Sequence, residues 1–167
     1  MNKPRINTDE HGSISEEELS VTRPIIAAAL EVANVLGAGF LEKVYRRALQ
    51  RELELRGMKV RCEVEFPVIY KGCRVGDYAA DIVVSDQVIV ELKCAECFHP
   101  EHMAQCINYL RASGLKVALL LNYYRARLNG NGSSTEPGFL IRVHPWLTPL
   151  LPAGRRAWSP RPDPPAW

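Results

Sequence analysis

The sequence predicts an α/β domain in which a mixed sheet is flanked by helices. Two segments with apolar residues at helical spacing come first, and three segments with the patterns of strands follow them. Another helical segment then precedes residues 115–121, whose unbroken apolar run is typical of a strand covered on both faces. The expected order is therefore helix, helix, three strands, helix, strand and strand.

The composition is that of an ordinary soluble protein. With 167 residues the chain is long enough for one domain with a real core, and 47% of its residues are apolar. The net charge of +2 is too small to indicate nucleic-acid binding by itself. We find no signal peptide and no apolar run of the roughly 18–20 residues that span a bilayer, so we expect a cytoplasmic protein without a membrane partner. Its five cysteines are expected to be free thiols.

The two N-terminal helices are predicted on either side of a glycine break. The first is expected to begin near Pro24, which suits a first helical turn, and to end at Gly37-Ala38-Gly39. Its core-facing residues would be Ile25, Ala29, Val32 and Leu36. The second is expected over about residues 40–56. Its apolar side would consist of Leu41, Val44, Ala48 and Leu55.

The remaining elements follow from alternation and from turn residues. Residues 60–68 alternate and predict a half-buried strand with one apolar face, made of Val60, Cys62, Val64, Phe66 and Val68. A strand at residues 75–84, a helix from Pro100 to about Gly114 and a last strand at 139–143 complete the domain. We place this domain at residues 19–144, between a flexible N-terminus (1–18) and a Pro-rich tail (145–167).

Residues 80–93 are the most informative segment, because two apolar runs flank a short polar turn. A turn centred on Asp86 gives an antiparallel hairpin whose register places one apolar set on a common face. The apolar pairs of that register are Val84 with Val88, Val83 with Ile89, Ile82 with Val90 and Ala80 with Leu92.

The same register places charged residues together. Asp81 falls opposite Glu91, and Lys93 falls one pair further along, opposite Ala79. Like charges that face each other in a sheet repel, so stability alone does not account for this pair. A divalent cation would neutralise the two carboxylates, and their hard oxygen atoms suit magnesium. Without a cation, one carboxylate should titrate with a raised pKa.

These residues, in this order, resemble the PD-(D/E)xK nuclease superfamily. Residues 39–45, Gly-Phe-Leu-Glu-Lys-Val-Tyr, also resemble the signature of the GxxExxY proteins within it. The resemblance covers about residues 25–125 and implies a restriction-endonuclease-like fold with an αβββαβ core. The linked features that carry it are Gly39, Glu42 and Tyr45, then Asp81, then Glu91-x-Lys93, and finally Gln105 on the following helix.

The resemblance implies a magnesium-dependent nuclease, with manganese as a possible substitute. Such an enzyme hydrolyses phosphodiester bonds of nucleic acid, with DNA as the expected partner and a homodimer as a possible assembly. The implied site residues are Asp81 and Glu91 as metal ligands, Lys93, Glu42 and Gln105 as catalytic groups, and His102 and Tyr45 as contacts to phosphate or water.

Other interpretations stay open. Asp81 and Glu91 could be surface charges of an edge hairpin, and Glu42 could be a first-turn carboxylate that the helix dipole favours. A non-catalytic nucleic-acid-binding or adaptor module could keep the nuclease fold. The small net charge favours this alternative, and so does a polar insertion after Asn122 in place of a short basic ending.

A cysteine- and histidine-rich stretch presents a separate possibility. Cys94, Cys97, His99 and His102 lie within nine residues and could in principle bind zinc. Zinc-finger spacings place a long segment between the two pairs of ligands, and this stretch has none. We therefore do not expect a structural zinc. Cys62 and Cys106 are expected to pack as small hydrophobic residues.

Overall fold

The computed structural model describes residues 16–124 and 141–143. The helices are α1 (Glu16–Leu36), α2 (Glu42–Leu55) and α3 (Pro100–Ser113). The strands are β1 (Val60–Tyr70), β2 (Cys73–Val84), β3 (Val88–Lys93), β4 (Val117–Asn122) and β5 (Ile141–Val143). The predicted order of elements is confirmed. Residues 16–18, predicted to be flexible, belong to α1, whereas the rest of that segment and the tail 145–167 lie outside the described residues.

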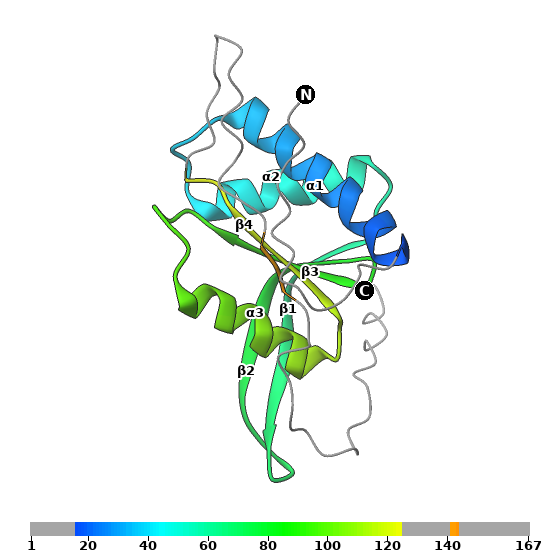
Figure 1. The fold of residues 1–167 in the computed structure, drawn as a ribbon, viewed down its shortest axis with the longest axis vertical. Coiled ribbons are helices and arrows are strands. Elements are labelled where there is room, and N and C mark those ends of the chain that lie inside the picture. The colour runs from blue at the N-terminus through cyan, green and yellow to red at the C-terminus, as the bar shows by residue number, and fades with distance from the viewer. Residues whose placement is uncertain (1–15, 125–140, 144–167) are drawn as a thin grey trace, which may run out of the picture.

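The strands form one mixed sheet in the order β1-β2-β3-β4-β5. Strands β3 and β4 are parallel, and the other neighbours are antiparallel. Helix α3 connects β3 to β4 across one face of the sheet, and α1 and α2 lie on the other face (Figure 1). The predicted class, a restriction-endonuclease-like mixed sheet flanked by helices, is confirmed. The carboxyl ends of β3 and β4 meet at one edge of the sheet.

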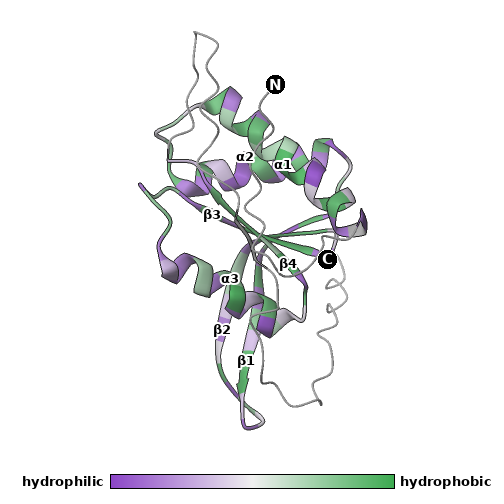
Figure 2. Cartoon of the chain, viewed as in Figure 1, coloured by the Kyte–Doolittle hydropathy of each residue, from purple (hydrophilic) through white to green (hydrophobic). Residues whose placement is uncertain are grey.

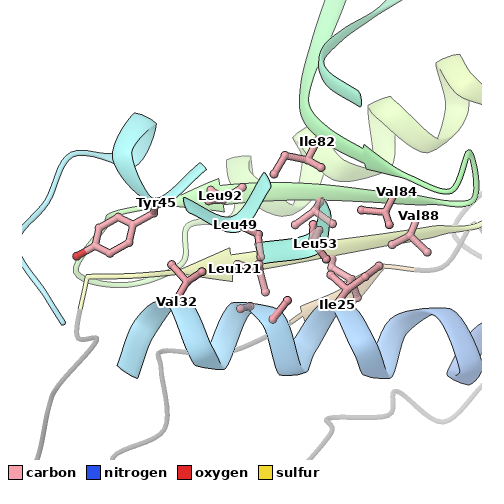
Figure 3. Packing of buried hydrophobic residues seen from close by; sticks show 14 of the residues in the cluster. Ile25, Val32, Tyr45, Leu49, Leu53, Ile82, Val84, Val88, Leu92 and Leu121 are labelled. Carbon is pink, nitrogen blue, oxygen red and sulfur yellow. The ribbon is translucent and has the colours of Figure 1, made fainter. Parts of the chain in front are cut away.

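Each face of the sheet carries its own apolar cluster. The cluster beneath α1 and α2 joins the two helices to the end of β2 and to alternate residues of β3 and β4, as Figure 3 shows for ten labelled side chains. The cluster beneath α3 takes the intervening residues of the same strands. Both central strands are therefore buried on two faces, and they are hydrophobic along most of their length (Figure 2).

Helix α1 begins earlier than predicted. Pro24 lies inside the helix rather than at its start, so the predicted start was wrong. An internal proline costs about 3 kcal/mol because it removes one helical hydrogen bond. Burial of the residues that follow offsets this cost, and they continue the helix to Leu36: Ile25, Ala28, Ala29, Val32 and Ala33.

Helix α1 also corrects an expectation about hydrophobic length. Its segment Glu18–Leu36 is long and apolar enough to cross a membrane by length and composition alone. The expectation that the chain holds no run of that length was therefore wrong. In the structure this segment places part of its surface against the sheet, where Ile25 and Val32 join the core (Figure 3).

The buried face of helix α2 differs in part from the predicted one. Its buried residues are Tyr45, Leu49 and Leu53. Leu41 is 66% exposed and Leu55 is 64% exposed, so their predicted core positions were wrong, whereas Ala48 packs against the core as predicted. The buried stripe starts within one turn of Glu42, which directs this carboxylate toward the sheet as well.

Strand β1 changes faces at Glu63, so the single apolar face predicted for it was wrong. Cys62 packs on the side of α1 and α2, whereas Val64 and Phe66 pack on the side of α3. Glu63 itself has φ 53°, in the left-handed region. One residue in that conformation rotates the strand, so the side chains that follow point to the other face. Beyond this point β1 and β2 continue as a two-stranded ribbon past α3 (Figure 1).

Candidate active site

The predicted hairpin register is confirmed for its inner part only. The backbone pairs are Val84 with Val88, Val83 with Ile89 and Ile82 with Val90. The pairs predicted beyond them do not form, namely Ala80 with Leu92, Asp81 with Glu91 and Ala79 with Lys93. The strands separate at Asp81, whose Oδ2 accepts a 2.9 Å hydrogen bond from the backbone N–H of Leu92. A side chain thus replaces the backbone partner where β2 leaves β3.

Asp81 and Glu91 still influence each other electrostatically. The Glu91 side chain is 3% exposed, and the Asp81 side chain is 16% exposed. Burial and the nearby negative charge of Asp81 raise the pKa of Glu91 to about 7. The expectation that one of the two carboxylates has a raised pKa agrees with this value.

Lys93 and Glu91 form the central ion pair of the site. Nζ of Lys93 donates a 2.7 Å hydrogen bond to Oε1 of Glu91. Burial alone would lower the pKa of Lys93, but the hydrogen bond to Glu91 and the charges of the surrounding carboxylates outweigh burial and raise it. Lys93 is therefore a cation at neutral pH. The other carboxylate oxygen, Oε2 of Glu91, is buried and has no hydrogen-bond partner among the described residues.

Glu42 reaches the same region from the start of α2. Burial raises its pKa, the charge of Lys93 lowers it, and the charge of Asp81 raises it. The nearby backbone N–H of Cys94 lowers this pKa as well. The structure thus brings Glu42 together with the end of β3, as the sequence predicts for a shared site.

Tyr45 holds the turn that precedes α2. Its hydroxyl donates a 2.7 Å hydrogen bond to the carbonyl of Gly37 and accepts a 3.2 Å one from the N–H of Phe40. Its ring stacks on Tyr123 at 4.5 Å between centroids and is fully buried. The hydroxyl that was a candidate for phosphate or water is therefore occupied by the backbone of the glycine turn.

Gln105 lies on α3 next to a tyrosine that anchors β2. Nε2 of Gln105 donates a 2.6 Å hydrogen bond to the Tyr109 hydroxyl, which donates a 2.8 Å hydrogen bond to the carbonyl of Ala79. Burial and then the charge of Glu91 raise the pKa of Tyr109. Gln105 is thus bonded to Tyr109, whose pKa depends on the charge of Glu91. Tyr109 in turn bonds to Ala79, which lies two positions before Asp81 on β2.

His102 is on the first turn of the same helix. Its Nδ1 accepts a 3.2 Å hydrogen bond from the backbone N–H of His99. Partial burial, followed by the positive charge of Lys93, lowers the pKa of His102, so the imidazole is neutral at pH 7. Because the charge of Lys93 affects the pKa of His102, we place His102 at the border of the site.

Two residues that the sequence analysis missed complete the arrangement. Arg46 contacts both Glu63, at 2.9 Å, and Asp81, at 3.5 Å. Asn122 holds the chain after Lys93, because its side chain accepts a 3.2 Å hydrogen bond from the N–H of Ala95 and donates a 2.7 Å one to its carbonyl. Arg46 could have been found from its position one turn after Glu42, on the same side of the helix. Asn122 could have been found because it ends an apolar strand.

A family model places the chain among known proteins. Residues 19–131 match the family model of the PD-(D/E)XK nuclease superfamily. The chain belongs to this superfamily. No curated protein matches it. Among solved structures, an alkaline exonuclease from Laribacter hongkongensis is similar with a TM-score of 0.44 and 15% identity, over 80% of this chain and 72% of that one.

Nucleases of this superfamily generally use divalent metal ions, and the donor set of this PD-(D/E)XK protein fits one. The buried Oε2 of Glu91 without a partner is the kind of atom that a cation satisfies. Within the described residues no three His, Cys, Asp or Glu side chains converge, and this holds for the stretch from Cys94 to His102 as well. A divalent cation such as magnesium commonly uses only one or two protein carboxylates and completes its shell with water, so a site with fewer than three such side chains does not rule one out.

Proposed function

We propose that this superfamily member is a magnesium-dependent nuclease, able to use manganese, that hydrolyses phosphodiester bonds of nucleic acid. The observation that carries the proposal is the buried Glu91, with one oxygen on Lys93 and the other without a hydrogen-bond partner among the described residues. A buried carboxylate of this kind is costly for stability unless a ligand uses it. We take DNA as the first substrate to test.

Asp81 and Glu91 are the proposed metal ligands. Both lie just beyond the last backbone pair of β2 and β3, where the two strands separate. The bound cation would neutralise charge on the phosphate and acidify a water molecule. The chain's own groups orient that water and the substrate. Because the raised pKa of Lys93 keeps it charged, its proposed role is to stabilise the negative charge that develops on the phosphate.

Glu42 and Gln105 are proposed to act on the attacking water. Glu42 is a half-buried carboxylate with a raised pKa, which suits a group that takes up a proton. Gln105 offers its side-chain amide from α3, on the other face of the sheet. His102 is proposed as a neutral hydrogen-bond donor to a phosphate at the rim.

Within the superfamily we propose a place among the GxxExxY proteins. Gly39, Glu42 and Tyr45 support it, because each has a distinct structural role at the turn that precedes α2. Gly39 has φ 103°, Tyr45 bonds to the backbone of that turn, and Glu42 starts the helix behind it. For cleavage of both strands of a duplex we propose pairing of two copies, which sedimentation with and without duplex DNA would detect.

A nucleic-acid-binding module without cleavage is the second candidate. The observation that favours it is the contact between Arg46 and Asp81, which already places a cation beside a proposed metal ligand.

One experiment separates the two candidates. Purified protein is incubated with single-stranded, duplex and branched DNA and RNA, in magnesium, manganese or EDTA. A nuclease cuts at least one substrate only when the metal is present, and Asp81→Asn abolishes cutting. Binding without cutting in every metal condition would support the binding module and contradict the nuclease.

A further inference from the structure

Arg46 occupies a distinctive place between α2 and the sheet. It lies one turn after Glu42, and its Nη1 atom is 2.9 Å from Oε1 of Glu63 and 3.5 Å from Oδ1 of Asp81. Its side chain is 21% exposed, so the guanidinium is partly shielded from water. A shielded ion pair has a larger electrostatic effect than one on the open surface.

The two oxygen atoms of Asp81 have different partners. Oδ2 accepts the hydrogen bond from the N–H of Leu92, which holds the carboxylate at the end of the β2–β3 pairing. Oδ1 faces Arg46 at a distance longer than a normal hydrogen bond, so it keeps capacity for a ligand. A divalent cation bound by Asp81 would act most directly on Oδ1, the same oxygen that Arg46 approaches.

We propose that Arg46 is a built-in counter-cation that holds Asp81 in the metal-free protein and competes with the divalent cation for it. The proposal rests on the metal site described under the proposed function. Arg46 acts as a positioning residue, because it touches a proposed metal ligand rather than the substrate. Arg46 also pairs with Glu63, so it can move away from Asp81 and still keep an ion pair with β1.

Glu63 is well placed for this exchange. It is the residue at which β1 changes faces, and its side chain is 69% exposed. An ion pair between Arg46 and Glu63 therefore ties α2 to this turn of the strand whether or not Asp81 carries a metal. Glu42, on the same helix, lies close enough to Lys93 for the lysine charge to lower its pKa.

Metal affinity tests the competition directly. Manganese is titrated calorimetrically into the wild type, Arg46→Met, Arg46→Lys and the control Arg47→Met, which alters the exposed neighbour on α2. Removal of the competing charge should make Arg46→Met bind manganese roughly tenfold more tightly, whereas Arg46→Lys keeps the charge and stays near the wild type. Arg47→Met should bind like the wild type.

Thermal unfolding gives a second measurement that does not depend on cleavage. Without metal, Arg46→Met should unfold at a lower temperature than the wild type, because two carboxylates lose their cation. Saturating manganese should close this difference, since tighter binding stabilises the variant more. A difference that persists at saturation would assign Arg46 a purely structural role and overturn the proposal.

Glu63→Gln offers a milder change that leaves Arg46 and the protein fold in place. It frees Arg46 to move toward Asp81 and should therefore weaken manganese binding. If the wild type binds manganese and Arg46→Met binds it equally or less tightly, the competition is wrong while the metal site stands. If neither protein binds manganese, the metal site itself is wrong and the competition falls with it.

Discussion

The backbone N–H of Leu92 donates a 2.9 Å hydrogen bond to Oδ2 of Asp81, just beyond the last backbone pair of β2 and β3. A side-chain carboxylate thus satisfies a backbone donor that would otherwise lose its partner where the strands separate. The same carboxylate keeps its second oxygen for Arg46 or for a cation. Asp81 therefore has both a structural and a proposed metal-binding role.

Asp81→Asn should separate these two roles. The amide oxygen can still accept the Leu92 hydrogen bond, so the metal-free protein should keep its fold and a similar free energy of unfolding. The loss of charge should weaken magnesium and manganese binding by at least roughly tenfold. Calorimetry measures the affinity, and Asp77→Asn, on the exposed part of β2, is the control. Metal binding unchanged in Asp81→Asn would remove Asp81 from the ligand set.

Lys93→Ala should remove cleavage without abolishing metal binding, because an ammonium group is not a metal ligand. The loss in rate should be roughly 10²–10⁴-fold. Without its cation Glu91 should hold its proton to higher pH, so metal binding by the variant should move to a more alkaline range. Single-turnover cleavage and calorimetry across pH measure both effects, with the exposed Lys43→Ala as the control. Equal cleavage rates in Lys93→Ala and wild type would contradict the role of Lys93.

Proton release on metal binding should follow the pKa of Glu91. In the metal-free fold this pKa is about 7, above the usual 4.5, so the folded state binds more protons than the unfolded state between these values. The Glu91 contribution to the free energy of unfolding therefore falls as pH rises through this window. Manganese binding needs the ionised form and should tighten over the same range. Calorimetry in buffers of different ionisation enthalpy should detect up to one released proton below the pKa.

Glu91→Gln is the matched variant for this titration. Glutamine resembles the protonated acid, so above pH 7 the metal-free variant should be more stable than the wild type by on the order of 1–3 kcal/mol. Near the usual carboxylate pKa the two proteins should be equally stable. Stability curves of both proteins that stay parallel at every pH would show that Glu91 titrates normally.

The register of β2 and β3 could be predicted from the sequence because alternation specifies which residues share a buried face. The prediction held from Val84 to Ile82 and failed at Asp81. The change of face in β1 was missed as well: it occurs at Glu63, whose left-handed conformation has no sequence signal because glycine or asparagine is the usual choice there. Alternation assumes a regular strand and cannot locate such a turn.

The candidate site shows the same limit. The Glu91-x-Lys93 spacing places both side chains on one side of a strand, so their contact could be predicted. The position of Arg46 one turn after Glu42 was only a weak signal, because an arginine on a charged helix usually remains in water. Its role depends on which face of α2 is buried, and the stripe that contains Tyr45 and Leu49 was not the one that the apolar residues suggested.

Glu42→Gln and Gln105→Ala should each lower cleavage with little change in stability. Neither residue belongs to the apolar clusters, and Gln105 donates to a hydroxyl that keeps its own bond to Ala79. A loss of roughly 10²-fold or more is expected for Glu42→Gln if the carboxylate takes up a proton. Cleavage assays and denaturant unfolding measure the two quantities, and Gln50→Ala on α2 is the control. Full activity in both variants would favour a site made of Asp81, Glu91 and Lys93 alone.

Tyr45→Phe should link the fold of the glycine turn to the position of Glu42. The change removes one hydroxyl that bonds to Gly37 and Phe40, and it leaves the ring stacked on Tyr123. Loss of a buried hydrogen bond should lower the free energy of unfolding by about 1–2 kcal/mol. The turn starts α2, so cleavage should also fall although Tyr45 does not face the substrate. Tyr70→Phe, at the exposed tip of the ribbon, should change neither property. A Tyr45→Phe protein that is as stable as the wild type but has lost cleavage would instead place the hydroxyl in the reaction itself.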